Sequence, residues 1–146
     1  MKGGFCVNLN RKFRIGDIYL IEFDGEYNEQ RGCRPGIIFQ NNIGNEYSPN
    51  VIVIPLTSVI KKINQPTHVL ISSENTGLIK DSIALCENPM CVSKNKIGRY
   101  LTTISDTYMS EIAKASLIAT SCLSYISDNE LLKIKNIATI LNTAIA

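Results

Sequence analysis

The fold is decided by two runs of apolar and β-branched residues, Gly36–Gln40 (GIIFQ) and Val51–Leu56 (VIVIPL). Both runs are short and are separated by asparagine, glycine, serine and proline, which is typical of strands in a β-sheet. The same pattern predicts four further strands, over Asp17–Phe23, His68–Ile71, Ser82–Cys86 and, more weakly, Arg99–Ile104. Six short strands joined by turns predict a mainly β fold, built as a small antiparallel barrel or a strongly curled sheet.

The pattern becomes helical after the last of these strands. Ser105 is placed to cap a helix, because apolar residues recur at helical spacing behind it. A second helix is predicted from Ser127, where Ser127 and Glu130 match the capping-box pattern and a stripe of leucine and isoleucine follows. We therefore expect a polar leader over residues 1–14, one domain over residues 15–122 and a helical extension over residues 123–146.

The composition suits a single globular domain, since 45% of the 146 residues are hydrophobic and only 19% are charged. The formal net charge of +2 is too small for a general attraction to nucleic acid, so any such binding must use a local cluster of cations. Five cysteines without a CxxC spacing and a single histidine argue against a disulfide scaffold and against a zinc site. With no signal-like start and no apolar run near the roughly 20 residues of a membrane span, the chain is expected to be cytoplasmic.

Two residues whose side chains can bind phosphate flank the two central predicted strands. Arg34 precedes the first, where Pro35 fixes the backbone after it, and Thr57 directly follows the second. A guanidinium is permanently charged and forked, so beside a hydroxyl it suits phosphate binding and the stabilisation of charge developing on phosphorus. Taken alone, however, Arg34 is better explained by a surface salt bridge and Thr57 by an ordinary strand end.

Several ordered motifs give the chain a family resemblance. They are Gly16–Tyr19 (GDIY), Arg34-Pro35, Gln40–Asn45 (QNNIGN), Leu56-Thr57 and Gly77–Ser82 (GLIKDS). In this order the sequence strongly resembles the MazF/PemK family, which comprises the ribonuclease toxins of bacterial toxin–antitoxin pairs. The resemblance spans roughly residues 14–120.

The resemblance implies an SH3-like curled barrel with C-terminal helices, a homodimer, and cleavage of single-stranded RNA at short sequences without a metal or a cofactor. It places the catalytic arginine on Arg34, the catalytic threonine on Thr57 and an active-site acid on Glu87. It also implies a cognate antitoxin whose acidic tail occupies the RNA groove. RNA contacts are expected from further polar residues, namely Gln30, Gln40, Asn41, Ser58, Lys61 and His68.

Cleavage of this kind uses the 2′-oxygen of the RNA itself, which attacks the adjacent phosphorus and leaves a 2′,3′-cyclic phosphate and a 5′-hydroxyl end. The protein has to orient the RNA backbone, move protons and stabilise the charge on phosphorus. Arg34 is predicted to supply positive charge, Thr57 to bind the phosphate or the 2′-hydroxyl, and Glu87 to accept the proton. A pair of histidines cannot do the proton work, because His68 is the only one.

Some of these residues also have structural explanations. Glu87 is about as well explained by an ion pair with Arg99 or Lys94 across the sheet, and His68 is better explained by a structural hydrogen bond. The lysines at positions 61 and 62, and the basic residues between positions 94 and 99, are more often solvated than bound to phosphate.

Two functions compete with RNA cleavage. One is a non-catalytic binding toxin on the same fold, like those that poison DNA gyrase, although those lack the Arg-Pro and threonine pair that this chain has. The other is a degenerate member that keeps the fold and the dimer but has lost activity. The family usually follows its active-site acid with a stretch that contains an arginine, whereas this chain has Asn88–Val92 (NPMCV), which leaves the RNA sequence open.

Two segments are expected to act beside the site. The polar, glycine-bearing loop Asp24–Cys33 should be mobile and should gate the groove. The apolar stripe of the terminal helix needs a partner surface, which we expect on its own domain or on a second subunit and not in a membrane.

Overall fold

The computed structural model describes residues 12–24, 31–61 and 63–143. Its strands are β1 (Asp17–Asp24), β2 (Arg31–Ile38), β3 (Asn50–Thr57), β4 (His68–Ile71), β5 (Ser82–Leu85), β6 (Met90–Ser93) and β7 (Ile97–Thr103). Its α-helices are α1 (Asn42–Tyr47), α2 (Asp106–Ala119) and α3 (Asp128–Thr143), with the short 3-10 turns η1 (Lys94–Lys96) and η2 (Cys122–Tyr125).

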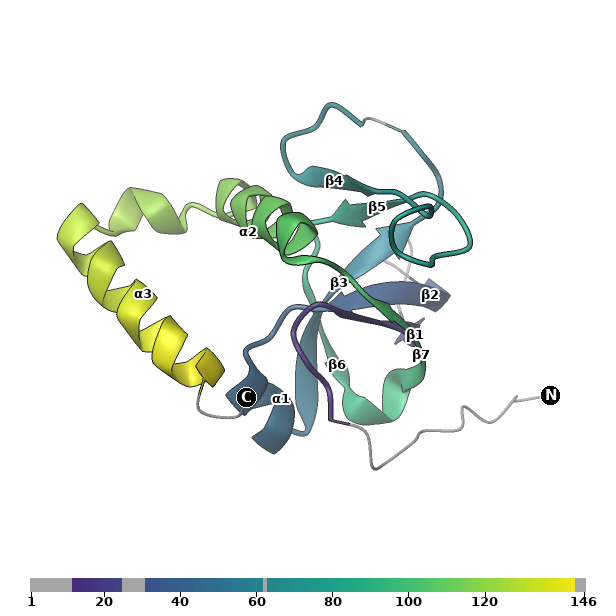
Figure 1. Ribbon diagram of the computed structural model, residues 1–146, viewed down its shortest axis with the longest axis horizontal. Helices are drawn as coiled ribbons and strands as arrows, with labels where there is room; N and C mark the ends of the chain where they lie inside the picture. Colours follow the sequence, from purple (N-terminus) through teal and green to yellow (C-terminus); the bar gives the residue numbers. More distant parts are fainter. Residues whose placement is uncertain (1–11, 25–30, 62, 144–146) are drawn as a thin grey trace.

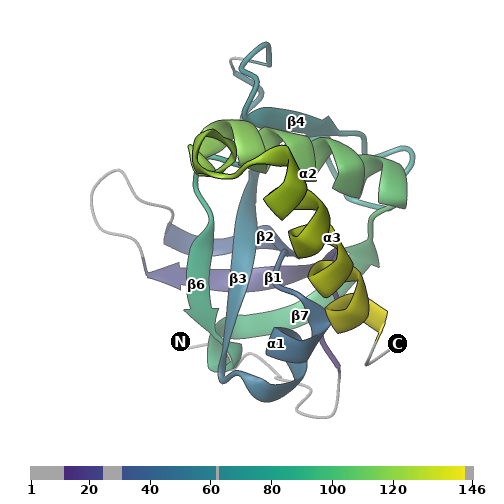
Figure 2. The same cartoon turned by 90° about the vertical axis from the view of Figure 1, so that its left-hand side faces the viewer.

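The strands pair antiparallel in one seven-stranded sheet, in the order β4-β5-β3-β2-β1-β7, with β6 added on β3. The long strand β3 has three partners, since it pairs first with β6, then also with β2 and finally with β5. Because one strand belongs to two parts of the sheet, the sheet curls, as Figures 1 and 2 show. The predicted fold class, a curled antiparallel sheet followed by C-terminal helices, is confirmed.

The sheet separates two apolar cores. One core contains Ile18, Ile37 and Ile54 of the sheet and is covered by Ile112 and Ala115 of α2. The other lies on the opposite face and is built from β1, β2, β3, β6 and β7; its largest members are Tyr19, Ile21, Phe23, Ile38 and Ile97. Sequence neighbours such as Ile37 and Ile38 belong to different cores, because successive side chains of a strand point to opposite faces.

The two predicted helix starts are confirmed by their caps. The Ser105 hydroxyl accepts a hydrogen bond from the Tyr108 N–H at 3.4 Å, and α2 follows. Before α3, the Ser127 hydroxyl accepts from the Glu130 N–H at 3.3 Å, while the Glu130 carboxylate accepts from the Ser127 N–H at 2.9 Å. This reciprocal pair is the capping box that the sequence predicted. The helix α2 then lies across β4 (Figure 2).

Besides small shifts at strand ends, such as β7 beginning at Ile97 and not at Arg99, three elements differ from the sequence prediction. The strand β2 begins at Arg31 and not at Gly36, because it pairs with β1 as far as Asp24. The strand β6, which follows a proline, was not predicted. The segment expected to be a turn after β2 forms the helix α1, whose cap is the Asn41 side chain accepting from the Gly44 N–H at 2.9 Å.

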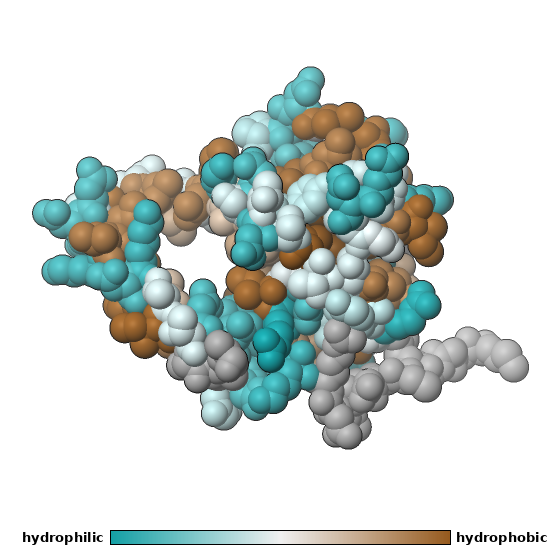
Figure 3. Space-filling view, viewed as in Figure 1, coloured by the Kyte–Doolittle hydropathy of each residue, from teal (hydrophilic) through white to brown (hydrophobic). Residues whose placement is uncertain are grey.

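The terminal helix α3 stands beside the sheet and not on it (Figure 1). It contains no buried residue, and its main packing partner among the other elements is α1. Its exposed apolar side chains include Leu132, Ile134, Ile137 and Ile140, and apolar surface is visible along this arm in Figure 3. Within one chain the described residues leave this stripe largely exposed, and its packing on a second subunit, the other predicted partner, stays a prediction. No helix within residues 12–24, 31–61 and 63–143 has the length and apolar character that crossing a membrane requires.

Candidate active site

A cleft of about 640 Å³ opens where β2 and β3 part from each other. Their pairing ends at Gly36 and Pro55, and one residue later β3 is paired with β5 through Leu56 and Ala84. The cleft is also bordered by the segment before β5 and by β7. Its lining residues are Leu20, Cys33, Arg34, Pro35, Leu56, Thr57, Ser58, Val59, Gly77, Leu78, Ile79, Lys80, Ser82, Arg99, Tyr100 and Leu101.

Arg34 and Thr57 both line this cleft, and both are half-buried. They lie at the same level of their strands, since each is two residues beyond the last pair that joins β2 to β3, Gly36 with Pro55. The two residues that the sequence singled out separately are thus brought to one opening. A guanidinium and a hydroxyl are groups that can bind an anion, and in half-buried surroundings water screens their interaction with it less than at an open surface.

The hydroxyl of Thr57 has a defined orientation. Its Oγ1 accepts a hydrogen bond from the Val59 N–H at 3.2 Å, in the turn that follows β3. An alcohol has one proton to donate and two lone pairs to accept with, so this contact leaves the Thr57 proton available to another acceptor. The Thr57 hydroxyl thus keeps a proton that it can donate.

The rest of the lining combines an apolar floor with a cationic rim. Leu20, Pro35, Leu56, Leu78 and Leu101 contribute apolar surface, and the polar members besides Arg34 include exposed Lys80 and Arg99. An apolar floor suits the faces of unstacked bases, and cations at the rim suit a phosphate backbone. The sequence did not single out Lys80, and Arg99 was grouped there with Lys94 and Lys96.

The structure divides that predicted basic group. The Lys96 ammonium pairs with the Asp24 carboxylate at 2.8 Å. The Lys94 ammonium donates to the Glu46 carbonyl at 3.4 Å and lies 5.8 Å from the centre of the Phe13 ring. Only Arg99 of the three lines the cleft.

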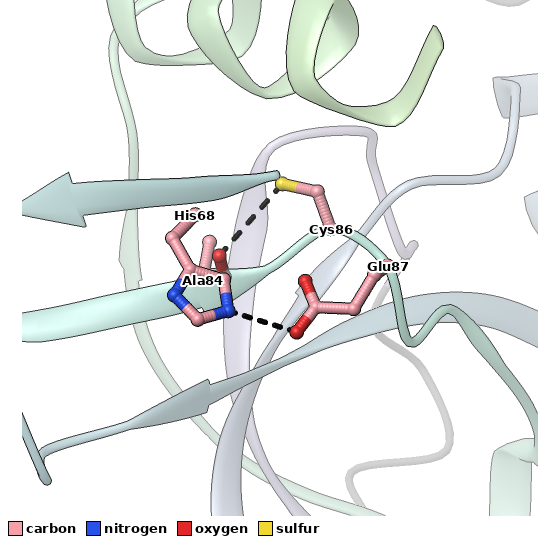
Figure 4. Close-up of polar contacts among 4 residues, drawn as sticks. All are labelled: His68, Ala84, Cys86 and Glu87. Carbon is pink, nitrogen blue, oxygen red and sulfur yellow. Dashed lines mark hydrogen bonds and ion pairs between the residues drawn. The ribbon is translucent and has the colours of Figure 1, made fainter. Parts of the chain in front are cut away.

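Glu87 and His68 form a pair outside the cleft lining. The His68 Nε2 and the Glu87 Oε1 lie 2.8 Å apart; the His68 side chain is 9% exposed and that of Glu87 is 42% exposed (Figure 4). Thr57 pairs with Ile83 near the start of β5, whereas Glu87 follows the end of that strand. Within one chain, this placement gives no support to the catalytic role predicted for Glu87. The partner of Glu87 is His68, and not Arg99 or Lys94.

Burial affects the thiol that precedes this acid. Burial raises the pKa of Cys86 from 9.0 to about 11, and the nearby charge of Glu87 acts in the same direction. The Cys86 Sγ donates a hydrogen bond to the Ala84 carbonyl at 3.8 Å (Figure 4). The thiol is 2% exposed and faces the core under α2. The described cysteines Cys33, Cys86, Cys91 and Cys122 are all free.

The other predicted RNA-binding residues have different surroundings. Ser58 lines the cleft beside Thr57, while Gln40, Asn41 and Lys61 do not. Gln40 donates from its side chain to the Asn50 carbonyl at 3.3 Å, and Asn41 caps α1. Gln30 and most of the predicted gating loop, residues 25–30, lie outside the described residues.

Comparison with known proteins places this arrangement in a family. The family model for the PemK-like, MazF-like toxins of type II toxin–antitoxin systems matches residues 14–119. The chain belongs to this toxin family. It is 43% identical, over 103 residues, to the protein called Endoribonuclease MazF of Staphylococcus saprophyticus; the match covers 70% of this chain and 86% of that relative.

Solved structures of MazF-like toxins have the same fold as this one. MazF of Deinococcus radiodurans, 17% identical, aligns with a TM-score of 0.66 over 79% of this chain and 99% of its own. A mycobacterial endoribonuclease, solved in complex with its cognate antitoxin and 23% identical, aligns with a TM-score of 0.61 over 73% of this chain and 92% of its own. The cleft of this MazF-like toxin thus lies in a fold shared with these proteins, whereas α3 follows the segment that the family model matches.

Proposed function

We propose that this MazF-like toxin is an endoribonuclease that cleaves single-stranded RNA at short sequences, with Arg34 and Thr57 at its reaction centre. The observation that carries the proposal is that these two residues, from different strands, line one cleft with a cationic rim. The name of the 43% identical relative, an endoribonuclease, supports the same reaction class.

In the proposed reaction, the ribose 2′-oxygen attacks the adjacent phosphorus as it loses its proton. The bond from phosphorus to the 5′-oxygen breaks, and that oxygen gains a proton, so the products are a 2′,3′-cyclic phosphate and a 5′-hydroxyl end. The Arg34 guanidinium stabilises the negative charge that accumulates on the non-bridging oxygens. Thr57 donates the proton that its contact with Val59 leaves available, and so fixes the phosphate against the guanidinium.

The identity of the proton acceptor is a separate part of the proposal. The sequence assigned it to Glu87, whose carboxylate contacts His68 in this chain. We keep that assignment as a hypothesis, to be tested by substitution independently of Arg34 and Thr57. The proposal that cleavage needs no metal is tested directly by adding a chelator.

We also propose a homodimer and a cognate antitoxin as partners. The basis for the antitoxin is the complex of the mycobacterial endoribonuclease and the MazE–MazF complex of Deinococcus radiodurans. An acidic, partly apolar segment suits the cleft, because cations line the rim and leucines the floor. On this proposal, residues 15–122 form the toxin domain and residues 123–146 are an extension.

The test is cleavage of a long single-stranded RNA by the purified protein in the presence of EDTA, followed by mapping of both ends at each cut. We expect cuts at one short sequence, leaving 5′-hydroxyl ends. Arg34→Ala should slow cleavage by roughly 100-fold or more, the size of effect seen when a donor to a developing anion is removed. The matched control is Arg14→Ala, since Arg14 is exposed and does not line the cleft.

The other outcomes separate the alternatives. RNA that stays intact while DNA gyrase is inhibited would identify a non-catalytic binding toxin. Intact RNA without gyrase inhibition, from a protein that melts cooperatively, would identify a member that has lost activity.

A further inference from the structure

We propose that Arg99, with Lys80 on the neighbouring segment, forms a second phosphate-binding position in the cleft, which holds the RNA backbone next to the cleaved linkage. This inference rests on the proposed function, because it concerns how the same substrate is held. Both side chains are exposed and both residues line the cleft that Arg34 and Thr57 share.

The strand pairing explains why Arg99 lies at the cleft. Along β1, Tyr19 pairs with Tyr100 and Ile21 pairs with Ile97, so that two residues of β7, Gly98 and Arg99, stand opposite the single residue Leu20. This is a β-bulge, a local irregularity that adds twist and changes the direction of a side chain, and bulges are frequent beside active sites.

A second irregularity lies next to the first. Ile18 pairs with Thr102 and Tyr19 with Tyr100, which leaves Leu101 as the extra residue. Leu101 lines the cleft, as Arg99 does. The two bulges of β7 therefore contribute one apolar and one cationic residue to the same opening.

Lys80 reaches the cleft from the segment that precedes β5. This segment lies against β7, since a Cβ placed on Gly77 would come 3.9 Å from the Thr102 hydroxyl oxygen. Among residues 12–24, 31–61 and 63–143, neither Lys80 nor Arg99 makes an ion pair with a carboxylate, in contrast to Lys96. Two exposed cations on adjacent segments, each unneutralised, suit an anion outside the protein.

The spacing separates this position from Arg34. β1 lies between β2 and β7, so the backbone at Arg99 is about two strand spacings, roughly 10 Å, from the backbone at Arg34. Leu20 of β1, which pairs with Pro35 on one side and stands opposite Gly98 and Arg99 on the other, also lines the cleft. An RNA strand that runs from one arginine to the other thus places different phosphates on each, with a base over the leucine floor.

The experiment begins with the RNA sequence that the wild-type protein cuts, mapped as above. Short RNAs containing that sequence are made with a 2′-deoxy residue at the cut, so that binding is measured without cleavage, and each carries one neutral methylphosphonate at a different linkage. We expect one flanking methylphosphonate to weaken wild-type binding by roughly tenfold. The same replacement should change the affinity of Arg99→Gln by less than about twofold, because the contact it removes is already absent.

Salt dependence gives an independent readout. The slope of log Kd against log salt concentration should fall by about 0.7 in Arg99→Gln, the contribution of one phosphate contact to a single strand. Arg99→Lys should restore the slope, and Lys133→Gln on α3, which removes the same charge outside the cleft, should leave it unchanged. In cleavage assays, the loss of activity in Arg99→Gln should appear mainly as a higher KM.

Failure of this inference is distinct from failure of the proposed function. A wild-type protein that cuts no RNA overturns the proposed function at the first step. A wild-type protein that cuts RNA, with Arg99→Gln showing the wild-type salt slope and the wild-type sensitivity at every linkage, overturns the second phosphate position alone. Equal melting temperatures of the variants exclude a folding defect as the cause of a lost contact.

Discussion

Replacing Thr57 by valine separates the hydroxyl of this residue from its shape. Valine keeps the β-branched form that suits the end of β3, and removes only the oxygen that accepts from the Val59 N–H at 3.2 Å. If the remaining proton of that hydroxyl binds the phosphate during cleavage, Thr57→Val loses a hydrogen bond to a charged group. Such bonds contribute about 1.5–3 kcal/mol, so kcat/KM should fall by roughly 10- to 150-fold.

The expected cost in stability is much smaller. Thr57 is half-buried, and Val59 and Ser58 are exposed, so water can replace the threonine oxygen as the acceptor for the Val59 N–H. The loss of one such hydrogen bond amounts to about 0.5–1 kcal/mol, which corresponds to a fall of only a few degrees in melting temperature for a domain of this size. Activity should therefore fall far more than stability.

The assay compares wild type, Thr57→Val and Thr57→Ser on the mapped RNA sequence, with melting temperatures measured in the same buffer. Serine keeps the hydroxyl and should restore kcat/KM to within about threefold of wild type. The reasoning is refuted if Thr57→Val cleaves at the wild-type rate. A loss in Thr57→Ser as large as that in Thr57→Val would mean that the methyl group of the threonine is needed as well as its hydroxyl.

Three further predictions concern Glu87, Cys86 and α3. For Glu87→Gln, which leaves a hydrogen-bonding group beside His68, the proton-acceptor hypothesis predicts a fall in cleavage of roughly 100-fold or more, with a fall of only a few degrees in melting temperature; cleavage within about tenfold of wild type would remove Glu87 from the reaction. Because burial raises the pKa of Cys86 from 9.0 to about 11, unfolding releases its proton between these values, so the free energy of unfolding should drop by up to about 3 kcal/mol from pH 9 to pH 11. Urea titrations should show that drop in wild type and a smaller one in Cys86→Ala. A chain that ends at residue 122 should melt within about 3 °C of the full chain, since α3 has no buried residue; a larger loss measured by circular dichroism would make α3 part of the domain.

The sequence predicted the parts of the fold that depend on local patterns. The strand His68–Ile71 has the predicted ends, and the capping box at Ser127 starts α3 as expected. The missed elements depend on distant pairing. The first residues of β2 include two glycines and a proline and carry no strand pattern, yet β1 supplies a partner for each of them as far as Arg31. β6 is likewise held by β3, which is not visible in its four residues.

The candidate site was predictable only in part, again because some of it depends on strand pairing between distant segments. Arg34 and Thr57 were singled out by the resemblance of their motifs, and the register of β2 and β3 brings them to one level. Arg99 reaches the cleft through a bulge in β7, and a bulge depends on pairing that the sequence does not display. Glu87 contacts His68, which lies on the paired strand β4. The sequence had suggested Arg99 or Lys94 as its ion-pair partner.

The position of the cleft follows from the chemistry of Pro35. The last pair that joins β2 to β3 is Gly36 with Pro55, and the next would join Pro35 to Leu56. Pro35 has no N–H to donate to a neighbouring strand, so the ladder loses a bond where it would have to continue. Leu56 pairs with Ala84 of β5 instead, and β2 stays with β1. The residues just beyond this fork, Arg34 on one branch and Thr57 on the other, consequently face an opening and not a continuous sheet, so the same proline that fixes the backbone of Arg34 also creates the space in which a phosphate can reach it.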